Sequence, residues 1–105
     1  MKDIKILLGK RIRELRKKLN ISQQELAEMI NIDARNLSNI ECGISFPSKT
    51  LFDISKVLKV TLPDLFDFEH QKYSIAEMKK YISKELNNVS DDNIIMLYKI
   101  IKALR

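Results

Sequence analysis

Apolar residues recur at helical spacing along this chain, and few residues interrupt them. The 105 residues include only two Gly and two Pro, and no segment alternates apolar and polar side chains as a half-buried strand does. In the first segment, apolar residues lie three or four positions apart: Ile4, Leu8, Ile12, Leu15 and Leu19. Because residues at these spacings share one face of a helix, the sequence predicts an all-α protein.

Capping motifs divide the pattern into short helices. Ser22 and Glu25 form a capping box, which opens a short helix that ends at Asn31. Asn tolerates the left-handed conformation that often stops a helix. A tight turn leads to Asp33, the expected cap of a third helix that stops near Gly43. Two short helices joined in this way are typical of a helix-turn-helix.

The rest of the chain continues in the same way. Pro47 and Ser48 mark the expected start of a fourth helix, and Thr61 with Asp64 caps a short fifth one. The expected helices cover residues 4–19, 22–30, 33–41, 48–58, 61–66, 74–86 and 91–105. We expect two parts: a domain that contains the helix-turn-helix, over residues 1–68, and a two-helix segment over residues 69–105.

Positive charge is concentrated at the start of the chain. The net charge is +5, yet residues 1–20 alone carry eight Lys and Arg against two acidic residues. Residues 21–70 carry four against eight, and residues 71–105 carry seven against four. A basic surface suits a protein that approaches a polyanion, but a solvated helix has the same composition. Charge alone therefore leaves both interpretations open.

The sequence lacks the residues that several classes of function need. Cys42 is the only cysteine, which excludes an intrachain disulfide and a two-cysteine zinc site, and His70 has no partner at ligand spacing. No nucleophile lies beside a base, and no glycine-rich phosphate loop is present. No apolar run approaches the roughly 18–20 residues of a membrane span. We expect a cytoplasmic protein that is not an enzyme and holds no cofactor or metal.

The third helix has an unusual outer face. Leu37 and Ile40 can face a core, whereas Arg35, Asn36, Ser38 and Asn39 point elsewhere. Solvated helices usually carry Glu and Lys, while Asn and Ser have lower helix propensity. These side chains favour a surface that forms hydrogen bonds to a partner.

Several short segments also occur in a characteristic order. RIRELR, SQQELA, NLSNIE, the Gly and Pro after it, and TLFDISKVLKV all lie within residues 9–66. In these motifs the chain resembles the Cro/phage-repressor type of helix-turn-helix regulator, often named the XRE family. The resemblance implies a five-helix, lambda-repressor-like domain whose third helix enters the DNA major groove. The family commonly has Gly at position 31 and Asn at 42, where this chain has Asn31 and Cys42.

The resemblance also implies roles for individual residues. The third-helix residues that match positions facing the bases are Ala34, Arg35, Asn36 and Asn39. Their chemistry agrees, because Arg pairs with guanine, Asn with adenine, and Ala can contact a thymine methyl group. The residues expected at the DNA backbone are Arg13, Gln23, Ser38, Ser45 and Lys49. Arg16 and Glu41 match a structural pair that joins the first helix to the end of the third.

Each assignment has a simpler alternative. The third-helix residues and Arg13 can be plain solvated side chains, and Arg16 with Glu41 can be a surface pair that contributes under about 1 kcal/mol. Cys42 can be an inert small residue or a redox-sensitive thiol.

The final helix is apolar over more than half of its circumference, which indicates burial on more than one side. We expect a homodimer built by the last two helices, with an interface that includes Ile94, Leu97, Tyr98, Ile101 and Leu104. The alternatives are a hairpin that packs on its own chain, or an antitoxin-like or adaptor protein whose tail binds a partner protein. The expected function is a transcriptional repressor that binds a pseudo-palindromic operator in double-stranded DNA.

Overall fold

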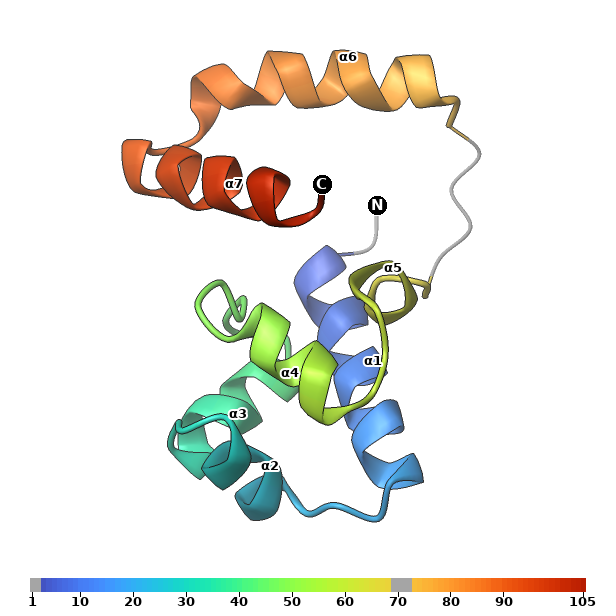
Figure 1. Cartoon of the computed structure of the whole chain (residues 1–105), viewed down its shortest axis with the longest axis vertical. Coiled ribbons are helices and arrows are strands. Elements are labelled where there is room, and N and C mark those ends of the chain that lie inside the picture. The colour runs from blue at the N-terminus through green and yellow to red at the C-terminus, as the bar shows by residue number, and fades with distance from the viewer. Residues whose placement is uncertain (1–2, 69–72) are drawn as a thin grey trace. The chain divides into compact units, whose positions relative to one another are not determined.

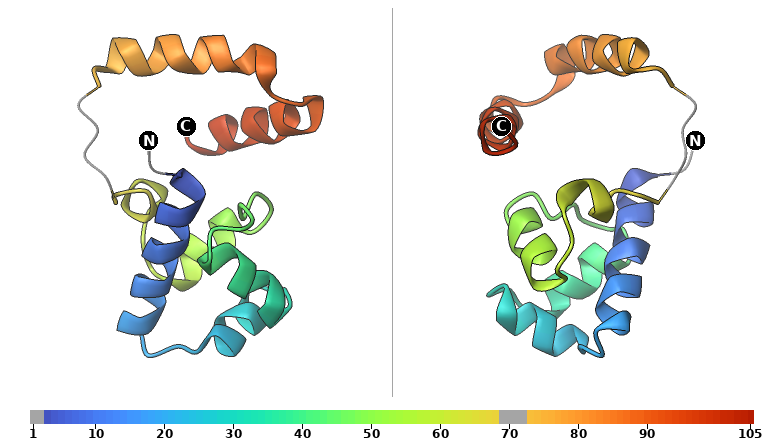
Figure 2. Two further views of the ribbon diagram at one scale, coloured as in Figure 1. Left: turned by 180° about the vertical axis from the view of Figure 1, so that it is seen from behind. Right: turned by 45° about the vertical axis from the view of Figure 1, so that its right-hand side comes forward.

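The computed structural model describes residues 3–68 and 73–105, and within them it contains helices and no strand (Figures 1 and 2). The helices are α1 (Ile4–Lys18), α2 (Gln23–Met29), α3 (Ala34–Glu41), α4 (Leu51–Val57), α5 (Leu62–Leu65), α6 (Ile75–Glu85), the 3-10 helix η1 (Leu86–Asn88) and α7 (Asp91–Ala103). The predicted all-α fold is confirmed.

The chain divides into two compact units, residues 1–70 and 71–105. The N-terminal unit contains the first five helices, and the C-terminal unit contains α6, η1 and α7. The predicted boundary between residues 68 and 69 lies within two residues of this division. His70 lies outside the described residues.

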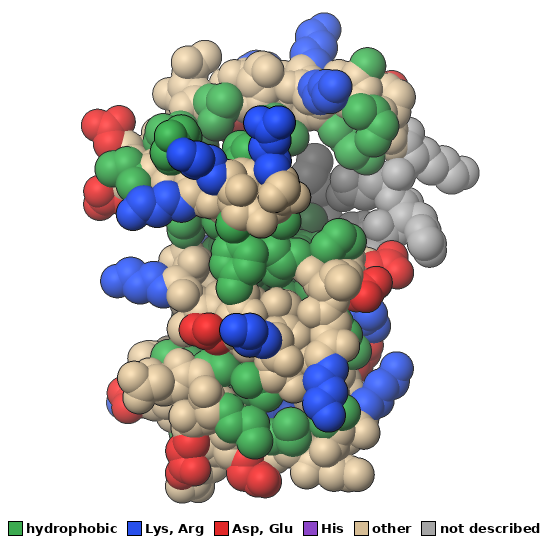
Figure 3. All heavy atoms as spheres, viewed as in Figure 1, with side chains coloured by type: hydrophobic (Ala, Val, Ile, Leu, Met, Phe, Trp, Pro, Cys, Tyr) green, Lys and Arg blue, Asp and Glu red, His purple; other side chains and the backbone are tan. Residues whose placement is uncertain are grey.

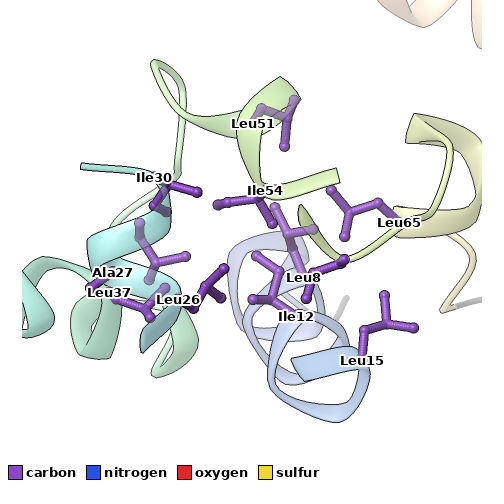
Figure 4. Packing of buried hydrophobic residues seen from close by; sticks show 12 residues of the cluster. Leu8, Ile12, Leu15, Leu26, Ala27, Ile30, Leu37, Leu51, Ile54 and Leu65 are labelled. Atoms are coloured by element: carbon purple, nitrogen blue, oxygen red, sulfur yellow. The ribbon is translucent and has the colours of Figure 1, made fainter. Parts of the chain in front are cut away.

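The core of the N-terminal unit is built by side chains from all five of its helices (Figure 4). Its largest fully buried members are Leu8, Ile12, Leu26, Leu37, Ile54 and Leu65. On α1 only the middle of the predicted apolar stripe is buried: Ile4 and Leu19, at its ends, are exposed. The helix extends beyond the core that it covers, so a periodic pattern overestimates burial at its ends.

Most of the expected caps form. Ser22 and Glu25 make both hydrogen bonds of a capping box, and the Thr61 hydroxyl accepts a hydrogen bond from the backbone N–H of Asp64. Asn31 has the left-handed φ of 58° that its position after α2 predicts. Asp33 is the N-cap residue of α3, as predicted, although its side chain accepts no cap hydrogen bond.

The predicted start of the fourth helix at Pro47 and Ser48 is wrong, because α4 begins at Leu51. The backbone N–H of Ser48 donates to the Phe46 carbonyl at 2.9 Å, which closes a tight turn before the helix. The first helical bond runs from Ile54 to the Thr50 carbonyl at 2.9 Å, and Thr50 is the N-cap residue. Residues 44–50 therefore form a longer loop between α3 and α4 than the sequence suggests.

The C-terminal unit has no buried residue in either of its α-helices. Its caps are in place, because Ser74 and Ser90 accept hydrogen bonds from the backbone N–H groups of Glu77 and Asn93. Hydrophobic side chains nevertheless cover much of the visible surface of α6 and α7 (Figure 3). Local signals thus define these helices, while their apolar surface lacks the burial that stabilises most helices in proteins.

Gly9 allows α1 to contact the C-terminal end of α3. A Cβ atom at this position would lie 2.5 Å from the Ile40 carbonyl oxygen and 2.6 Å from the Glu41 carbonyl oxygen. A glycine near the start of a helix can mean that the helix begins after it, or that a neighbouring element lies too close for a side chain. Because α1 begins at Ile4, the close neighbour explains Gly9. The backbones of the two helices approach so closely that no side chain fits between them.

We predict that Gly9→Ala destabilises the protein although Ala has the higher helix propensity. The propensity gain of about 1 kcal/mol is smaller than the cost of separating α1 from α3, so the free energy of unfolding should fall by about 1–2 kcal/mol. Urea denaturation measures the change. Lys10→Ala, at an exposed position of the same helix, is the control and should change stability by less than about 0.5 kcal/mol. A stabilised Gly9→Ala variant would contradict the close approach.

Candidate nucleic-acid interface

Helices α2 and α3 are joined by a tight turn that fixes the angle between them (Figures 1 and 2). Within this turn the backbone N–H of Ile32 donates to the Ala27 carbonyl at 2.9 Å, and that of Asn31 donates to the Glu28 carbonyl at 3.2 Å. Leu26 of α2 and Leu37 of α3 are fully buried. One side of α3 is thereby fixed against α2 and the core, which determines the side that faces outward.

The outward side of α3 carries the predicted base-contacting residues. Ala34, Arg35 and Asn36 are exposed at its N-terminal end, and Ser38 and Asn39 are half-buried in the next turn. Leu37, Ile40 and Glu41 are buried on the opposite side. The first turn of α3 can therefore approach the edges of bases without disturbing the core.

The other end of α3 is held by a buried ion pair. Arg16 Nε donates to Glu41 Oε2 at 2.7 Å, and Arg16 Nη2 donates to Glu41 Oε1 at 3.0 Å. The Arg16 and Glu41 side chains are only 9% and 2% exposed. Arg16 Nη1 also donates to the Ile21 carbonyl at 2.8 Å. The guanidinium thus joins α1, the segment before α2, and the C-terminal end of α3 in a planar, two-bond geometry.

Gln23 belongs to the same network. Its side-chain Nε2 donates to Glu41 Oε1 at 2.9 Å, so the first residue of α2 is tied to the last residue of α3. The family resemblance implied only a phosphate contact for Gln23. Its contact with Glu41 depends on how two helices cross, which the sequence alone does not show. An amide nitrogen has two N–H groups, and one remains for another acceptor. The network can therefore orient Gln23 for a contact outside the protein.

The loop between α3 and α4 places further predicted contact residues beside α3. Asn36 of α3 and Ser45 and Lys49 of the loop line one open hollow. The backbone N–H groups of Ile44 and Ser45 both donate to the Asn39 carbonyl, at 2.9 and 3.3 Å, which fixes the loop against the helix. Arg13 is exposed on α1, and neither it nor Ser38 lines this hollow.

Four of the predicted self-association residues lie on α7, and the fifth, Leu104, is its C-cap residue. Ile94 and Leu97 are half-buried, whereas Tyr98, Ile101 and Leu104 are exposed. These residues belong to the C-terminal unit, whereas α3 belongs to the N-terminal unit.

The remaining sites offer little chemistry. Cys42, the C-cap residue of α3, is exposed and forms no disulfide. Across residues 3–68 and 73–105, no group of three or more His, Cys, Asp or Glu side chains is arranged to hold a metal ion. None of the helices in these ranges has the length and apolar character that crossing a bilayer requires.

Comparison with known proteins identifies this arrangement. A family model described as helix-turn-helix matches residues 12–65, which include α2, the turn, α3 and the loop that follows. The chain belongs to the Cro/phage-repressor type of helix-turn-helix regulators. The predicted XRE-family resemblance is therefore confirmed, and with it a role in DNA-binding transcription regulation.

Three helix-turn-helix proteins similar to this chain come from different organisms. The HTH-type transcriptional regulator ImmR of Bacillus subtilis is 32% identical over 92 residues, covering 85% of this chain and 72% of that protein. The control protein C.MunI of a Mycoplasma species is 41% identical over 68 residues, covering 63% of this chain and 92% of that protein. An HTH-type regulator of Archaeoglobus fulgidus is 32% identical over 63 residues, covering 59% of this chain and 89% of that protein.

The match to ImmR is longer than the N-terminal unit. Its 92 residues exceed the 70 residues of that unit, so the similarity extends into the C-terminal unit. Wherever these residues begin along the chain, the match includes α6, so α6 is part of what this chain shares with a relative in the helix-turn-helix family.

We predict that Glu41→Gln lowers the free energy of unfolding by about 3 kcal/mol, because it leaves the buried Arg16 guanidinium without its counter-charge. Chemical denaturation measures the loss. Glu28→Gln removes an exposed carboxylate from α2 and should cost less than about 0.5 kcal/mol. Equal effects of the two substitutions would show that the ion pair does not hold α3.

Proposed function

We propose that this protein is a sequence-specific repressor of transcription that binds a pseudo-palindromic operator as a homodimer, with α3 in the major groove. The observation that supports this proposal most directly is the exposed first turn of α3, which combines Ala34, Arg35 and Asn36 on a helix held at its other end by a buried ion pair. A dimer that occupies an operator excludes other proteins from the same DNA, which is the simplest route to repression.

The residues of α3 have complementary roles in this proposal. Arg35 donates two hydrogen bonds to guanine O6 and N7, and Asn36 or Asn39 pairs with adenine N6 and N7. Ala34 contacts a thymine methyl group. Each good bidentate pair contributes about 1–3 kcal/mol of discrimination against the wrong base. A short helix therefore specifies only a few base pairs.

Residues around α3 bind the phosphate backbone in the same proposal. These are Arg13 of α1, Gln23 and Ser38 of the helix-turn-helix, and Ser45 and Lys49 of the α3–α4 loop. Asn36, Ser45 and Lys49 line a common hollow, so a base contact and two backbone contacts can form side by side. Phosphate contacts supply affinity and fix the register but do not read the sequence.

In this proposal the C-terminal unit forms the dimer, and the second copy contacts the second half of the operator. A two-fold dimer places two copies of α3 on half-sites about 10 base pairs apart, which doubles the sequence that is read. The exposed apolar side chains of α6 and α7 provide surface for such pairing. The proposed interface includes Ile94, Leu97, Tyr98, Ile101 and Leu104 of α7.

Selection of bound duplexes from a random pool tests the function. We expect one enriched motif made of two inverted half-sites with centres about 10 base pairs apart, or a multiple of that distance. A pool that shows no enrichment at low ionic strength would contradict sequence-specific binding. An enriched single half-site would retain DNA recognition but contradict the palindromic operator.

Substitutions at Arg35 and Lys49 separate base recognition from backbone binding on the selected operator. Arg35→Ala should cost about 1–3 kcal/mol on that sequence and relax the preference at one base position. Lys49→Ala should weaken binding to all sequences equally and reduce the slope of log K against log salt by about 1. Fluorescence anisotropy at several salt concentrations measures both effects. A uniform loss for Arg35→Ala would contradict its base contact.

Truncation tests the role of the C-terminal unit. A chain ending at Phe68 should remain folded, sediment as a monomer and bind the full operator at least about tenfold more weakly, because two-fold pairing no longer adds the second half-site. Analytical ultracentrifugation and DNA titration measure the two properties. A full-length monomer at tens of micromolar, with unchanged operator affinity after truncation, would contradict the proposed dimer.

A second candidate function keeps DNA binding secondary and assigns the C-terminal unit to a partner protein, as in an antitoxin or adaptor. The exposed apolar side chains of α6 and α7 support it. Purification from the native host distinguishes the two, because a stoichiometric second protein on the C-terminal unit would favour this candidate.

A further inference from the structure

Two asparagines of α3 have different surroundings, although they are only three residues apart in the sequence. Asn36 and Ile40 are four residues apart within α3, so they lie on one side of the helix. Ile40 is buried, and both residues line the open hollow between α3 and the loop that leads to α4. Asn39 does not line this hollow. The side of α3 that carries Asn36 therefore faces the loop.

Arg35 and Asn39 share another side of α3. They are also four residues apart within the helix, and neither lines the hollow. Because an α-helix turns by about 100° per residue, Arg35 lies about 100° from Asn36 around the axis, and Asn39 lies about 60° from it in the same direction. Arg35 and Asn39 are thus neighbours on the outward side of the helix, and Asn36 is set apart from both.

The hollow combines apolar surface with groups that can bind an anion. Five of the residues that line it are polar, Asn36 and Lys49 among them, and four are apolar, including Phe46 and Pro47. Three of the polar residues carry hydroxyl groups: Ser45, Ser48 and Thr50. A sugar–phosphate unit of DNA has the same two parts, because the carbon atoms of deoxyribose are apolar and the phosphate is an anion.

A hollow and a projecting side chain suit different parts of a DNA duplex. Base edges lie at the floor of a major groove about 8.5 Å deep, so a side chain must project from the helix to reach them. The sugar–phosphate backbone forms the rim of the groove, and a rim fits into a hollow. Asn is among the side chains that bind phosphate and sugar in protein–DNA complexes. The position of Asn36 therefore favours the backbone, and that of Asn39 favours the bases.

Both walls of the hollow are fixed by hydrogen bonds within the protein. The backbone N–H groups of Ile44 and Ser45 donate to the Asn39 carbonyl at 2.9 and 3.3 Å, and the backbone N–H of Ser48 donates to the Phe46 carbonyl at 2.9 Å. The opposite wall belongs to α3, which the buried ion pair holds at its C-terminal end. A backbone unit can therefore enter the hollow without rearranging either wall.

We propose that Asn36 binds the sugar–phosphate backbone in this hollow together with Lys49, and that Asn39 pairs with adenine beside the guanine contact of Arg35. This inference rests on the proposed function, in which either asparagine can make the adenine contact. The Asn36 amide donates a hydrogen bond to a phosphate oxygen, and the Lys49 ammonium group neutralises charge on the same unit. One asparagine then contributes affinity, and the other contributes specificity.

The reverse assignment conflicts with the geometry of α3. Turning the helix until Asn36 faces the floor of the groove would turn Arg35 away from it by the same angle. The buried ion pair of Arg16 and Glu41 opposes such a rotation, because it fixes the end of α3. A single orientation of the helix presents Arg35 and Asn39 to the bases and Asn36 to the backbone.

The test compares Asn36→Ala with Asn39→Ala in the full-length protein. Both changes remove the same group from the same helix and raise helix propensity, so each variant is the matched control for the other. The probes are duplexes that the wild-type protein selects from a random pool, together with a set in which each base pair of one half-site is changed singly. Fluorescence anisotropy measures the dissociation constants, and thermal unfolding followed by circular dichroism checks that both variants are folded.

We expect the two variants to differ in which duplexes they bind less tightly. Asn39→Ala should lose about tenfold on the selected duplex but little on duplexes already changed at one particular base pair. Asn36→Ala should lose the same factor on every duplex, about fivefold. It should leave the slope of log K against log salt unchanged, because a neutral side chain releases no counterion.

A double-mutant cycle tests the shared hollow. The combined loss from Asn36→Ala and Lys49→Ala should be smaller than the product of the single losses, because both residues bind one backbone unit. The losses from Asn39→Ala and Lys49→Ala should multiply, because their partners on the DNA differ.

Four results would overturn this inference and leave the proposed function intact. They are a changed base preference for Asn36→Ala, a uniform loss for Asn39→Ala, an Asn36→Ala variant that binds within about twofold of the wild type, and independent effects of Asn36→Ala and Lys49→Ala. A wild-type protein that selects no sequence would contradict the proposed function itself, and this inference with it.

Discussion

Helix α3 is held in place by a guanidinium and a carboxylate that are both buried. Arg16 and Glu41 make two short hydrogen bonds, and the ion pair joins the end of α1 to the end of α3. Gly9 acts at the same end of α3, where the backbones of the two helices meet. Both constraints apply to the C-terminal end of α3, which leaves its N-terminal turn free. Because a buried charge without its partner is costly, the tilt of α3 is linked to the stability of the whole unit.

Features that depend on neighbours in sequence could be predicted well. The capping box of Ser22, the cap at Thr61 and the left-handed Asn31 each follow from interactions within a few residues. The predictions failed where a periodic pattern carries no information. Because of the turn at Phe46 and Ser48, α4 begins later in the sequence than predicted. Leu19, just after α1, lies beyond the core. Neither feature can be seen in a periodic pattern of apolar residues.

Some features of the candidate site could be predicted from the sequence, and others could not. The polar face of α3 could be expected from its composition, because Asn and Ser are poor choices for a helix unless their hydrogen bonds are used. Arg16 and Glu41 are 25 residues apart, and only the resemblance to a family suggested their pairing. The contact of Gln23 with Glu41 was not predicted at all, since it requires the crossing angle of α2 and α3. Residue types identify the surface, and the fold determines which of them act together.

The two units differ in how their helices are stabilised. The N-terminal unit buries a full core, whereas α6 and α7 contain no buried residue. Helices of 11 and 13 residues are marginal in water, so their order depends on covering the apolar face. If a second copy provides that cover, association and ordering of the C-terminal unit occur together. Operator occupancy then rises more steeply than in proportion to protein concentration, because the species that reads both half-sites forms only by pairing. A regulator that assembles in this way responds to its own abundance.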